Sequence, residues 1–301
     1  MRFKLIKTIV VLILILSVTG GGKAMAGPIP PEVKSVVVFI FVEREGKLIP
    51  NGTAFLVGVK NPSDPTTFTV YLITARHVLY KSDTTEFLDK VYVRVNKKGG
   101  GSEVGTIPIR VKGDKKNVFF HNDPSVDIAA IPFLPDQNKF DFKFLPDELI
   151  TTQKDYDHLK IREGSDVFFT GLFTPYSGSE MNYPVVRFGR VALVTNEKIE
   201  WQGKQMSLYL IEAGSYGGNS GAPVFFYLGS DREPGALVVG SPVLKLAGIM
   251  QGTFRDAQEI KVIETKQVPI SLSNMGIAAI VPAYKLHELL FSEELKHQRG
   301  F

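Results

Sequence analysis

Short runs of apolar or alternating residues recur along most of the chain. The runs are rich in Val, Ile, Phe and Tyr, and clusters of Gly, Pro, Asn and Asp separate them. Many short strands separated by turn residues are typical of an all-β sandwich or barrel. The runs span residues 35–42, 53–59, 69–74, 91–96, 104–111, 127–133, 166–172, 185–195, 206–212, 222–228, 237–240, 246–250 and 276–281. About a dozen strands divide naturally into two sets of six, so we predict an N-terminal half over residues 27–145 and a C-terminal half over 146–301.

Helical periodicity is clearest near the C-terminus. Leu286, Leu289, Leu290 and Leu295 recur at roughly helical spacing after Pro282, with polar and charged residues among them. This pattern predicts a C-terminal helix that packs on the second half of the fold.

Two polar segments interrupt the series of strands. Residues 147–160 are predicted to supply a short helix that connects the two halves. Residues 253–273 lack clear strand periodicity and are predicted to form a mobile excursion.

The first 26 residues carry the pattern of a secretory signal peptide. Three basic residues within the first seven positions precede a mostly apolar run over 8–18, and a small-x-small site follows at 24–26. This pattern predicts cleavage after Ala26 and export to the periplasm or medium of a bacterium. The alternative is an uncleaved membrane anchor, but this run of eleven residues falls short of the roughly 20 that span a bilayer.

The predicted cleavage changes the charge of the chain. The removed segment holds four of the 35 basic residues and no acidic one, so 31 basic residues balance 31 acidic residues in the mature chain. This balance gives no reason to expect a nucleic acid or an anionic membrane as a partner. The chain contains no cysteine, which excludes disulfides, thiolate metal sites and a lipoprotein anchor. A hydrophobic content of 44% suffices for one large or two small cores.

A glycine-rich bend at residues 217–223 places Ser220 just ahead of an apolar run. A hydroxyl is a weak nucleophile unless a base takes its proton, and acyl transfer also needs donors for the developing oxyanion. Upstream, an apolar strand ends at His77, and Asp127 opens another apolar run. An imidazole titrates near neutrality, which suits a base that later returns the proton. The chain therefore offers His, Asp and Ser, in this order, as candidate catalytic residues.

These motifs resemble those of the trypsin-like (chymotrypsin-fold) serine peptidases, in particular of the bacterial Deg/HtrA branch. The resemblance spans roughly residues 35–290. It rests on Gly-Thr-Ala-Phe at 52–55, Thr-Ala-Arg-His at 74–77, Asp-Ile-Ala at 127–129 and Gly-Asn-Ser-Gly-Ala-Pro at 218–223. Two features depart from the pattern: Ala222 stands where many members have a second glycine, and no PDZ-like module follows the peptidase region.

The resemblance implies two six-stranded antiparallel barrels with the active site in the cleft between them. It also implies that Ser220 is the nucleophile, that His77 is the general base and that Asp127 fixes the imidazole tautomer. The backbone N–H groups of Gly218 and Ser220 would form the oxyanion hole. Asp123 is an alternative acid, but it precedes a proline in a turn, whereas Asp127 opens a run with the character of a buried strand.

Other residues are implied to select the substrate. The floor of the primary pocket corresponds to Gly214, six residues before the nucleophile, with Ser215 beside it. No fixed carboxylate stands there, so we expect substrates with a small or apolar residue before the scissile bond, unless Glu212 swings into the pocket. The strand that pairs with a substrate in the family is matched near Met250 and Gln251, and these two residues are predicted to border the pocket.

Activation by cleavage of a propeptide is not expected. Residues 27–31 are too proline-rich to copy the inserted N-terminus by which secreted trypsins activate. Asn219 also lacks the carboxylate with which such an amine would pair.

Neither a metal nor a cofactor is expected. His121, His158, His287 and His297 lie in polar or helical surroundings without the spacing of a metalloprotease site, and they are interpreted as surface residues. The expected partner is a protein or peptide substrate, and the sequence leaves the oligomeric state open.

Two other functions are alternatives to a serine endopeptidase. An α/β-hydrolase esterase would need a glycine at Ala222 and the order Ser, Asp, His. The stronger alternative is a trypsin-like scaffold that acts as an extracytoplasmic binding protein, with cleavage restrained by a distorted oxyanion loop.

Overall fold

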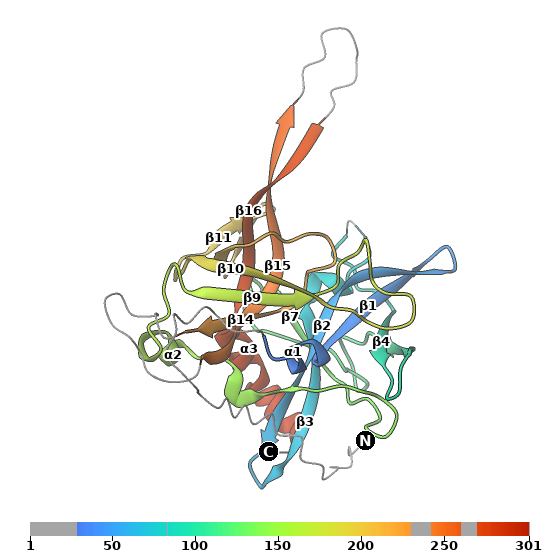
Figure 1. The fold of residues 1–301 in the computed structure, drawn as a ribbon. Coiled ribbons are helices and arrows are strands. Elements are labelled where there is room, and N and C mark those ends of the chain that lie inside the picture. The colour runs from blue at the N-terminus through green and yellow to red at the C-terminus, as the bar shows by residue number, and fades with distance from the viewer. Residues whose placement is uncertain (1–28, 83, 230–241, 260–269, 301) are drawn as a thin grey trace.

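The computed structural model describes residues 29–82, 84–229, 242–259 and 270–300 of the 301-residue chain. The predicted signal segment at 1–26 and the predicted strand at 237–240 lie outside these residues. Within them the chain is mostly β-structure, which confirms the predicted class, and the strands form one body from which a two-stranded arm projects (Figure 1).

The first half of the chain folds into an eight-stranded sheet. Its path runs β5-β4-β1-β2-β3-β7-β6, and β8 pairs with β2 in parallel while the neighbours along the path are antiparallel. The strands are β1 (Val37–Arg44), β2 (Lys47–Asn61), β3 (Asp64–Ala75), β4 (Lys90–Asn96), β5 (Ser102–Pro108), β6 (Phe119–Phe120), β7 (Ile128–Pro132) and β8 (Leu145–Pro146).

The second half forms a closed six-stranded barrel with the order β10-β13-β16-β15-β14-β9. A separate hairpin, β11-β12, is inserted between two of its strands in the sequence. The strands are β9 (Asp166–Gly171), β10 (Val185–Leu193), β11 (Ile199–Trp201), β12 (Lys204–Met206), β13 (Tyr209–Glu212), β14 (Pro223–Leu228), β15 (Val243–Glu259) and β16 (Ile270–Pro282).

The prediction of two six-stranded barrels therefore needs correction in the first half. There the pairing of the described strands gives an eight-stranded sheet whose path does not close. The two additional strands, β6 and β8, are only two residues long each. Two residues are too few to show an alternation of apolar and polar positions, so strands of this length cannot be predicted from such a pattern.

The C-terminal helical pattern also divides. It forms α3 (Ala283–Leu290) and α4 (Glu293–Arg299), because the Ser292 side chain accepts a hydrogen bond from the backbone N–H of Leu295 and starts a new helix. The predicted connecting helix corresponds to a 3₁₀ turn at Asp147–Leu149 followed by α2 (Gln153–His158), and a short α1 (Glu32–Ser35) precedes β1. No helix among the described residues has the length and hydropathy of a membrane span.

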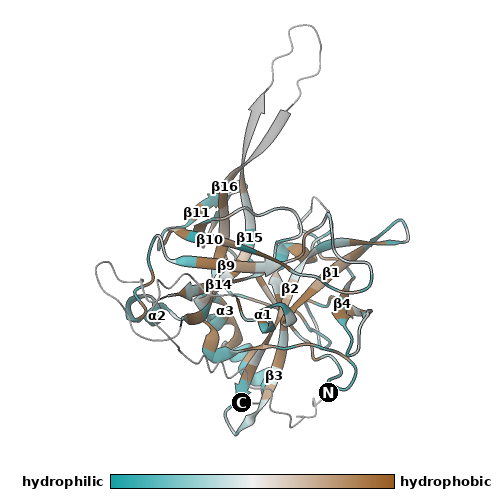
Figure 2. Ribbon diagram, in the orientation of Figure 1, coloured by the Kyte–Doolittle hydropathy of each residue, from teal (hydrophilic) through white to brown (hydrophobic). Residues whose placement is uncertain are grey.

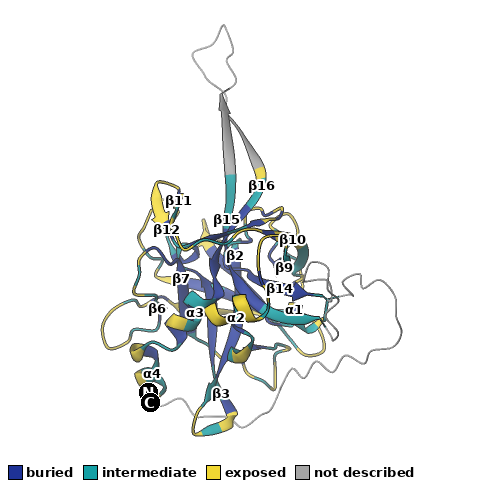
Figure 3. Ribbon diagram, turned by 90° about the vertical axis from the view of Figure 1, so that its left-hand side faces the viewer, coloured by how far each residue is buried: buried dark blue, intermediate teal, exposed yellow. Residues whose placement is uncertain are grey.

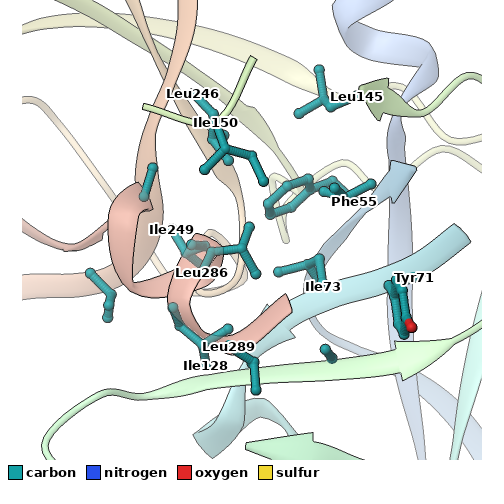
Figure 4. Packing of buried hydrophobic residues seen from close by; sticks show 14 of the residues in the cluster. Phe55, Tyr71, Ile73, Ile128, Leu145, Ile150, Leu246, Ile249, Leu286 and Leu289 are labelled. Carbon is teal, nitrogen blue, oxygen red and sulfur yellow. The ribbon is translucent and has the colours of Figure 1, made fainter. Parts of the chain in front are cut away.

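One hydrophobic cluster spans both halves of the molecule. Figure 4 shows Phe55 and Ile73 of the first sheet facing Ile249 of the barrel and Leu286 and Leu289 of α3. Each of these side chains is almost completely buried, and burial of one such residue contributes about 1.5–3 kcal/mol. The helix α3 therefore packs where the two halves meet, and not on the second barrel alone. Figure 2 shows hydrophobic residues along the central strands, and Figure 3 shows that the central strands are largely buried.

The projecting arm is built from the ends of β15 and β16. Their pairing continues from Arg255 opposite Asn274 to Glu259 opposite Ile270. The expectation that residues 253–273 contain no strand is therefore wrong for 253–259 and 270–273, and 260–269 lie outside the described residues. Paired strands in a projecting hairpin are joined through their backbones, so they do not require the alternation imposed by a buried face.

Candidate active site

Pairing of β3 with β7 brings His77 to Asp127. Ala75 lies opposite Ile128, so the residues that follow β3 meet the residue that precedes β7. In the 3₁₀ turn Arg76–Leu79 the backbone N–H of His77 donates to Asp127 Oδ1 at 3.1 Å, and its ring Nδ1 lies 2.5 Å from Oδ2. The ring is thus held through both its backbone and its Nδ1, which leaves Nε2 as the atom for proton transfer.

Asp127 is buried, with 4% of its surface exposed. Burial alone raises its pKa, but the hydrogen bond and charge of His77, a hydrogen bond from Gln251 and the nearby Arg76 together hold the pKa of Asp127 below the ordinary value. Gln251 Nε2 donates to Oδ2 at 2.6 Å, and Arg76 Nε lies 3.8 Å from Oδ1. This carboxylate is therefore ionised at neutral pH and can stabilise an imidazolium.

Ser220 lies in the bend between β13 and β14. Its Oγ donates to the backbone carbonyl of Gln251 at 3.0 Å. Within the described part of the chain, no hydrogen bond joins Ser220 to His77. Both residues nevertheless line one cavity of about 890 Å³ together with Asp127 and Gln251. Catalytic hydrogen bonds are often long or absent in unliganded enzymes, and a rotation about the Cα–Cβ bond of Ser220 redirects its hydroxyl.

Two glycines of the bend are required by its geometry. Gly218 has φ +90° and Gly221 has φ +84°, a region that L side chains rarely adopt. A Cβ at Gly221 would lie 2.1 Å from the carbonyl oxygen of Thr53, and one at Gly218 would lie 2.7 Å from Thr174 Cγ2. The bend therefore presses closely against the first sheet on one side and against residue 174 on the other.

Thr53 of β2 fixes the position of the bend. Its Oγ1 donates to the Gly218 carbonyl at 2.7 Å and accepts from the backbone N–H of Leu172 at 2.9 Å, and its own N–H donates to the Ser220 carbonyl at 2.9 Å. Thr174 Oγ1 donates to the Gly217 carbonyl at 3.2 Å. These contacts use carbonyls of the bend, whereas the N–H groups of Gly218 and Ser220 have no acceptor among the described residues. An oxyanion hole needs N–H donors of this kind that no other group of the chain occupies.

Asn219 stabilises the bend through its neutral side chain. Its Nδ2 donates to the Leu172 carbonyl at 2.6 Å, and its Oδ1 accepts from the backbone N–H of Tyr216 at 2.9 Å. The residue is buried, at 3% exposed. The side-chain amide therefore pairs with one backbone N–H and one backbone carbonyl, and it does so without the charge of a carboxylate.

Asp123, the alternative acid, has other partners. Its Oδ1 accepts hydrogen bonds from the side chain and the backbone N–H of Ser125, and its carboxylate lies 3.3 Å from Lys198 Nζ. The Ser125 hydroxyl bond and the Ser125 backbone bond lower the pKa of Asp123 to about 2. Among the described contacts, the carboxylate that reaches His77 belongs to Asp127.

The predicted specificity residues do not all reach the cavity. Gln251 lines it, whereas Met250 is fully buried among the side chains of the barrel core. Gly214 lines a separate hollow of about 600 Å³ together with Glu212. Ser215 is 1% exposed.

The cavity that contains Ser220 is also lined by residues that were not predicted from the sequence. They include Tyr216, Gly217, Gly252, Phe254 and Trp201. The Trp201 and Phe254 rings meet edge to face at 4.7 Å, and a Cβ at Gly252 would lie 3.0 Å from Trp201 Cζ2. The β11-β12 hairpin turns at Gln202 and Gly203, which both have positive φ, as a type I′ turn requires, and Gly203 is the local sequence signal for this turn.

Among the described residues, no group of three or more His, Cys, Asp or Glu side chains is arranged to hold a metal ion. The imidazole of His121 instead lies 2.8 Å from a carboxylate oxygen of Glu288. The cavity therefore offers acid–base and hydrogen-bonding groups from the chain itself.

Thr53→Val is expected to lower both stability and turnover. Valine matches threonine in shape but has no hydroxyl, so the buried Leu172 N–H and Gly218 carbonyl lose their partner. We expect the free energy of unfolding to fall by about 1–3 kcal/mol and peptide hydrolysis to slow, as measured by denaturant titration and initial rates. Thr53→Ser keeps the hydroxyl and is the matched control. A Thr53→Val enzyme with wild-type stability and rate would contradict this role.

The trypsin-like peptidase domain family matches residues 52–230. No curated protein sequence matches the chain. Similar solved structures include the MamO protease domain from Magnetospirillum magneticum in its apo form, with 18% identity, a TM-score of 0.48, and coverage of 86% of this chain and 97% of that one.

Two further structures have the same order of similarity. Tobacco etch virus protease with its product shares 13% identity at a TM-score of 0.46, covering 90% of this chain and 84% of that one. A serine-to-alanine mutant of Rv3671c from M. tuberculosis H37Rv, in its inactive form, shares 16% identity at a TM-score of 0.41, covering 89% of this chain and 90% of that one. The family match extends over more than half of the length of the chain, so the chain belongs to the trypsin-like peptidase domain family.

Proposed function

We propose that this protein is an exported serine endopeptidase that hydrolyses peptide bonds through Ser220, His77 and Asp127. The observation that carries the proposal is the imidazole of His77, held 2.5 Å from the buried, ionised Asp127 in a cavity that also contains Ser220. This arrangement supplies a nucleophile, a base and a group that orients the base.

In the proposed reaction, the Ser220 hydroxyl leaves the Gln251 carbonyl and turns toward His77. Nε2 takes the proton as Oγ attacks the substrate carbonyl carbon, and the N–H groups of Gly218 and Ser220 bind the oxyanion. The imidazolium, stabilised by Asp127, gives the proton to the leaving amine and an acyl-serine remains. Water, activated by the same imidazole, then releases the acid and restores the hydroxyl.

The proposed substrate is an extended polypeptide with a small or apolar residue before the scissile bond. The apolar side chains of the cavity lining, Trp201, Met206 and Phe254, support this proposal; the charged residues Arg76, Asp127, Glu200 and Lys204 line the same cavity. An aliphatic side chain that packs against Trp201 and Phe254 gains roughly 1.5–3 kcal/mol from burial, whereas a cation packed against these rings loses hydration.

A second candidate function is a restrained scaffold that binds polypeptides without cleaving them at rest. The hydrogen bond from Ser220 Oγ to Gln251 favours it, because the hydroxyl is not directed at His77. A substrate that binds an active arrangement of Ser220 and His77 more tightly than this one shifts the population toward the active arrangement.

A fluorophosphonate probe tests the proposal, because only an activated serine is labelled rapidly. We expect the wild type to be labelled at one site and Ser220→Ala not at all. Mass-spectrometric profiling on a peptide library should show faster cleavage after Val, Ala or Leu than after Lys or Arg. Wild-type protein that neither labels nor cleaves would favour the scaffold. A preference for basic residues that is lost in Glu212→Gln would instead assign specificity to Glu212.

Export is proposed from residues 1–26, which lie outside the described residues. N-terminal sequencing of protein recovered from the periplasm or medium should find Gly27 first. Full-length chain in the membrane fraction would favour the uncleaved anchor.

A further inference from the structure

Arg187 of β10 lies beneath the loop that leads to the nucleophile. Its guanidinium carbon is 4.6 Å from the centre of the Tyr216 ring and 5.5 Å from that of Phe173. Its Nη1 donates to the Gly214 carbonyl at 3.3 Å. One planar cation thus contacts two aromatic rings and a backbone carbonyl, and all three contacts are made by segments beside Ser220.

The two segments that Arg187 joins are those that hold the oxyanion donors. On one side, Phe173 lies between Leu172, whose carbonyl accepts from Asn219, and Thr174, whose hydroxyl donates to Gly217. On the other side, Gly214 and Tyr216 begin the loop that continues into the bend. The guanidinium therefore bridges the support of the bend and the loop that enters it.

This environment differs from that of a surface arginine. Arg187 Nε is buried without a hydrogen-bond partner in the described structure, and no carboxylate pairs with the guanidinium among the described residues. An arginine three positions along the same strand, Arg190, instead forms an exposed ion pair with Asp166 at 3.2 Å, with 67% of its side chain accessible. A buried donor without an acceptor costs free energy, so the stacking and the bond to Gly214 must offset that cost.

We infer that Arg187 is a positioning residue for catalysis: it holds the loop 214–218 so that the Gly218 N–H faces the developing oxyanion. The inference rests on the proposed peptidase function. The loop contains three glycines at 214, 217 and 218, and glycine gives a backbone wide conformational freedom. Without the guanidinium, the loop samples conformations in which the donor points elsewhere. Stabilisation of the transition state is then lost, while substrate contacts along Gly252 and Phe254 remain.

Kinetics of Arg187→Met beside Arg190→Met test this role. Methionine keeps the apolar stem but removes the charge and the planar donors. We expect kcat of Arg187→Met to fall on the order of 10²-fold, as for loss of one oxyanion donor, with KM nearly unchanged and slower fluorophosphonate labelling. Arg190→Met should keep wild-type values. Arg187→Lys retains the charge but not the planar stack, so we expect only partial recovery.

Amide hydrogen exchange provides a readout that does not require activity. Peptides covering residues 213–221 should exchange faster in Arg187→Met than in the wild type, and at the wild-type rate in Arg190→Met. Unchanged exchange, or a kcat that stays at the wild-type level while only thermal stability falls, overturns the inference. If the wild type itself neither labels nor cleaves, the proposed function fails, while exchange still decides whether Arg187 orders the loop.

Discussion

Replacing either Ser220 or His77 with alanine is expected to abolish peptidase activity and leave the fold intact. The attacking oxygen and its base act as one unit, so loss of one removes nearly the whole contribution of the pair, on the order of 10⁶ in kcat for a comparable triad. Both residues line the open cavity, so neither replacement removes packing from the hydrophobic clusters. Initial rates on a cleaved peptide, together with thermal unfolding of each variant, measure the two effects.

The matched control for Ser220→Ala is Ser207→Ala. Ser207 Oγ lies 2.9 Å from Ser125 Oγ, and Ser207 is not among the residues that line the cavity. This variant should retain wild-type rates. Cleavage by Ser220→Ala at the wild-type rate would remove the basis for the serine peptidase mechanism.

Asp127→Asn is expected to lower kcat by about 10⁴-fold, the loss that the serine protease template shows for the equivalent change. The structure gives the reason. Asp127 accepts from the His77 backbone N–H, and its Oδ2 lies 2.5 Å from His77 Nδ1 and 2.6 Å from Gln251 Nε2. An asparagine at position 127 must place its NH₂ group where one of the two carboxylate oxygens lies. There the NH₂ group either faces another N–H donor or forces the imidazole of His77 into the other tautomer.

Asp123→Asn is the control, and it should leave kcat unchanged because Asp123 binds Ser125 and Lys198. The opposite result, with the large loss at Asp123, would transfer the role of the triad acid to Asp123. Either outcome is measured from the rates of the two variants on one substrate.

Acid pH provides a second measurement on Asp127. The folded state holds the pKa of Asp127 below its ordinary value of 3.8. A lowered folded-state pKa means that ionised Asp127 contributes stability in full above the ordinary value, and that this contribution is lost as the pH falls through the lowered value. The difference in unfolding free energy between the wild type and Asp127→Asn should therefore shrink below about pH 4.

Local features of the sequence mark the three candidate catalytic residues, and the structure brings all three to one cavity. His77 and Asp127 flank strands whose length and apolar character are visible in the sequence, and pairing of β3 with β7 then brings them together. Ser220 lies in a bend that needs positive φ at Gly218 and Gly221, and glycine is the residue that supplies it. The chemistry and the conformation of each segment were thus encoded within a few residues.

The walls of the cavity were less predictable because they depend on contacts between distant segments. Counting six residues back from Ser220 led to Gly214, but that residue lines a different hollow, and Tyr216 stands at the wall with its ring against Arg187. Trp201 reaches the cavity from an inserted hairpin. Local patterns could not indicate where that hairpin folds back, since its position depends on packing against Phe254.

Ser220, the proposed nucleophile, belongs to the barrel through its chain neighbours, but its backbone carbonyl accepts a hydrogen bond from the other half of the molecule. Ser220 connects two strands of the barrel, yet Thr53 of the first sheet binds the carbonyls of both Gly218 and Ser220. A displacement of one half relative to the other would therefore move Ser220 Oγ. A misplacement of about 1 Å at a reacting atom lowers the rate of an enzyme roughly 10²-fold. In the proposed reaction, loss of the contacts between the two halves would therefore lower the rate even while the barrel remains folded.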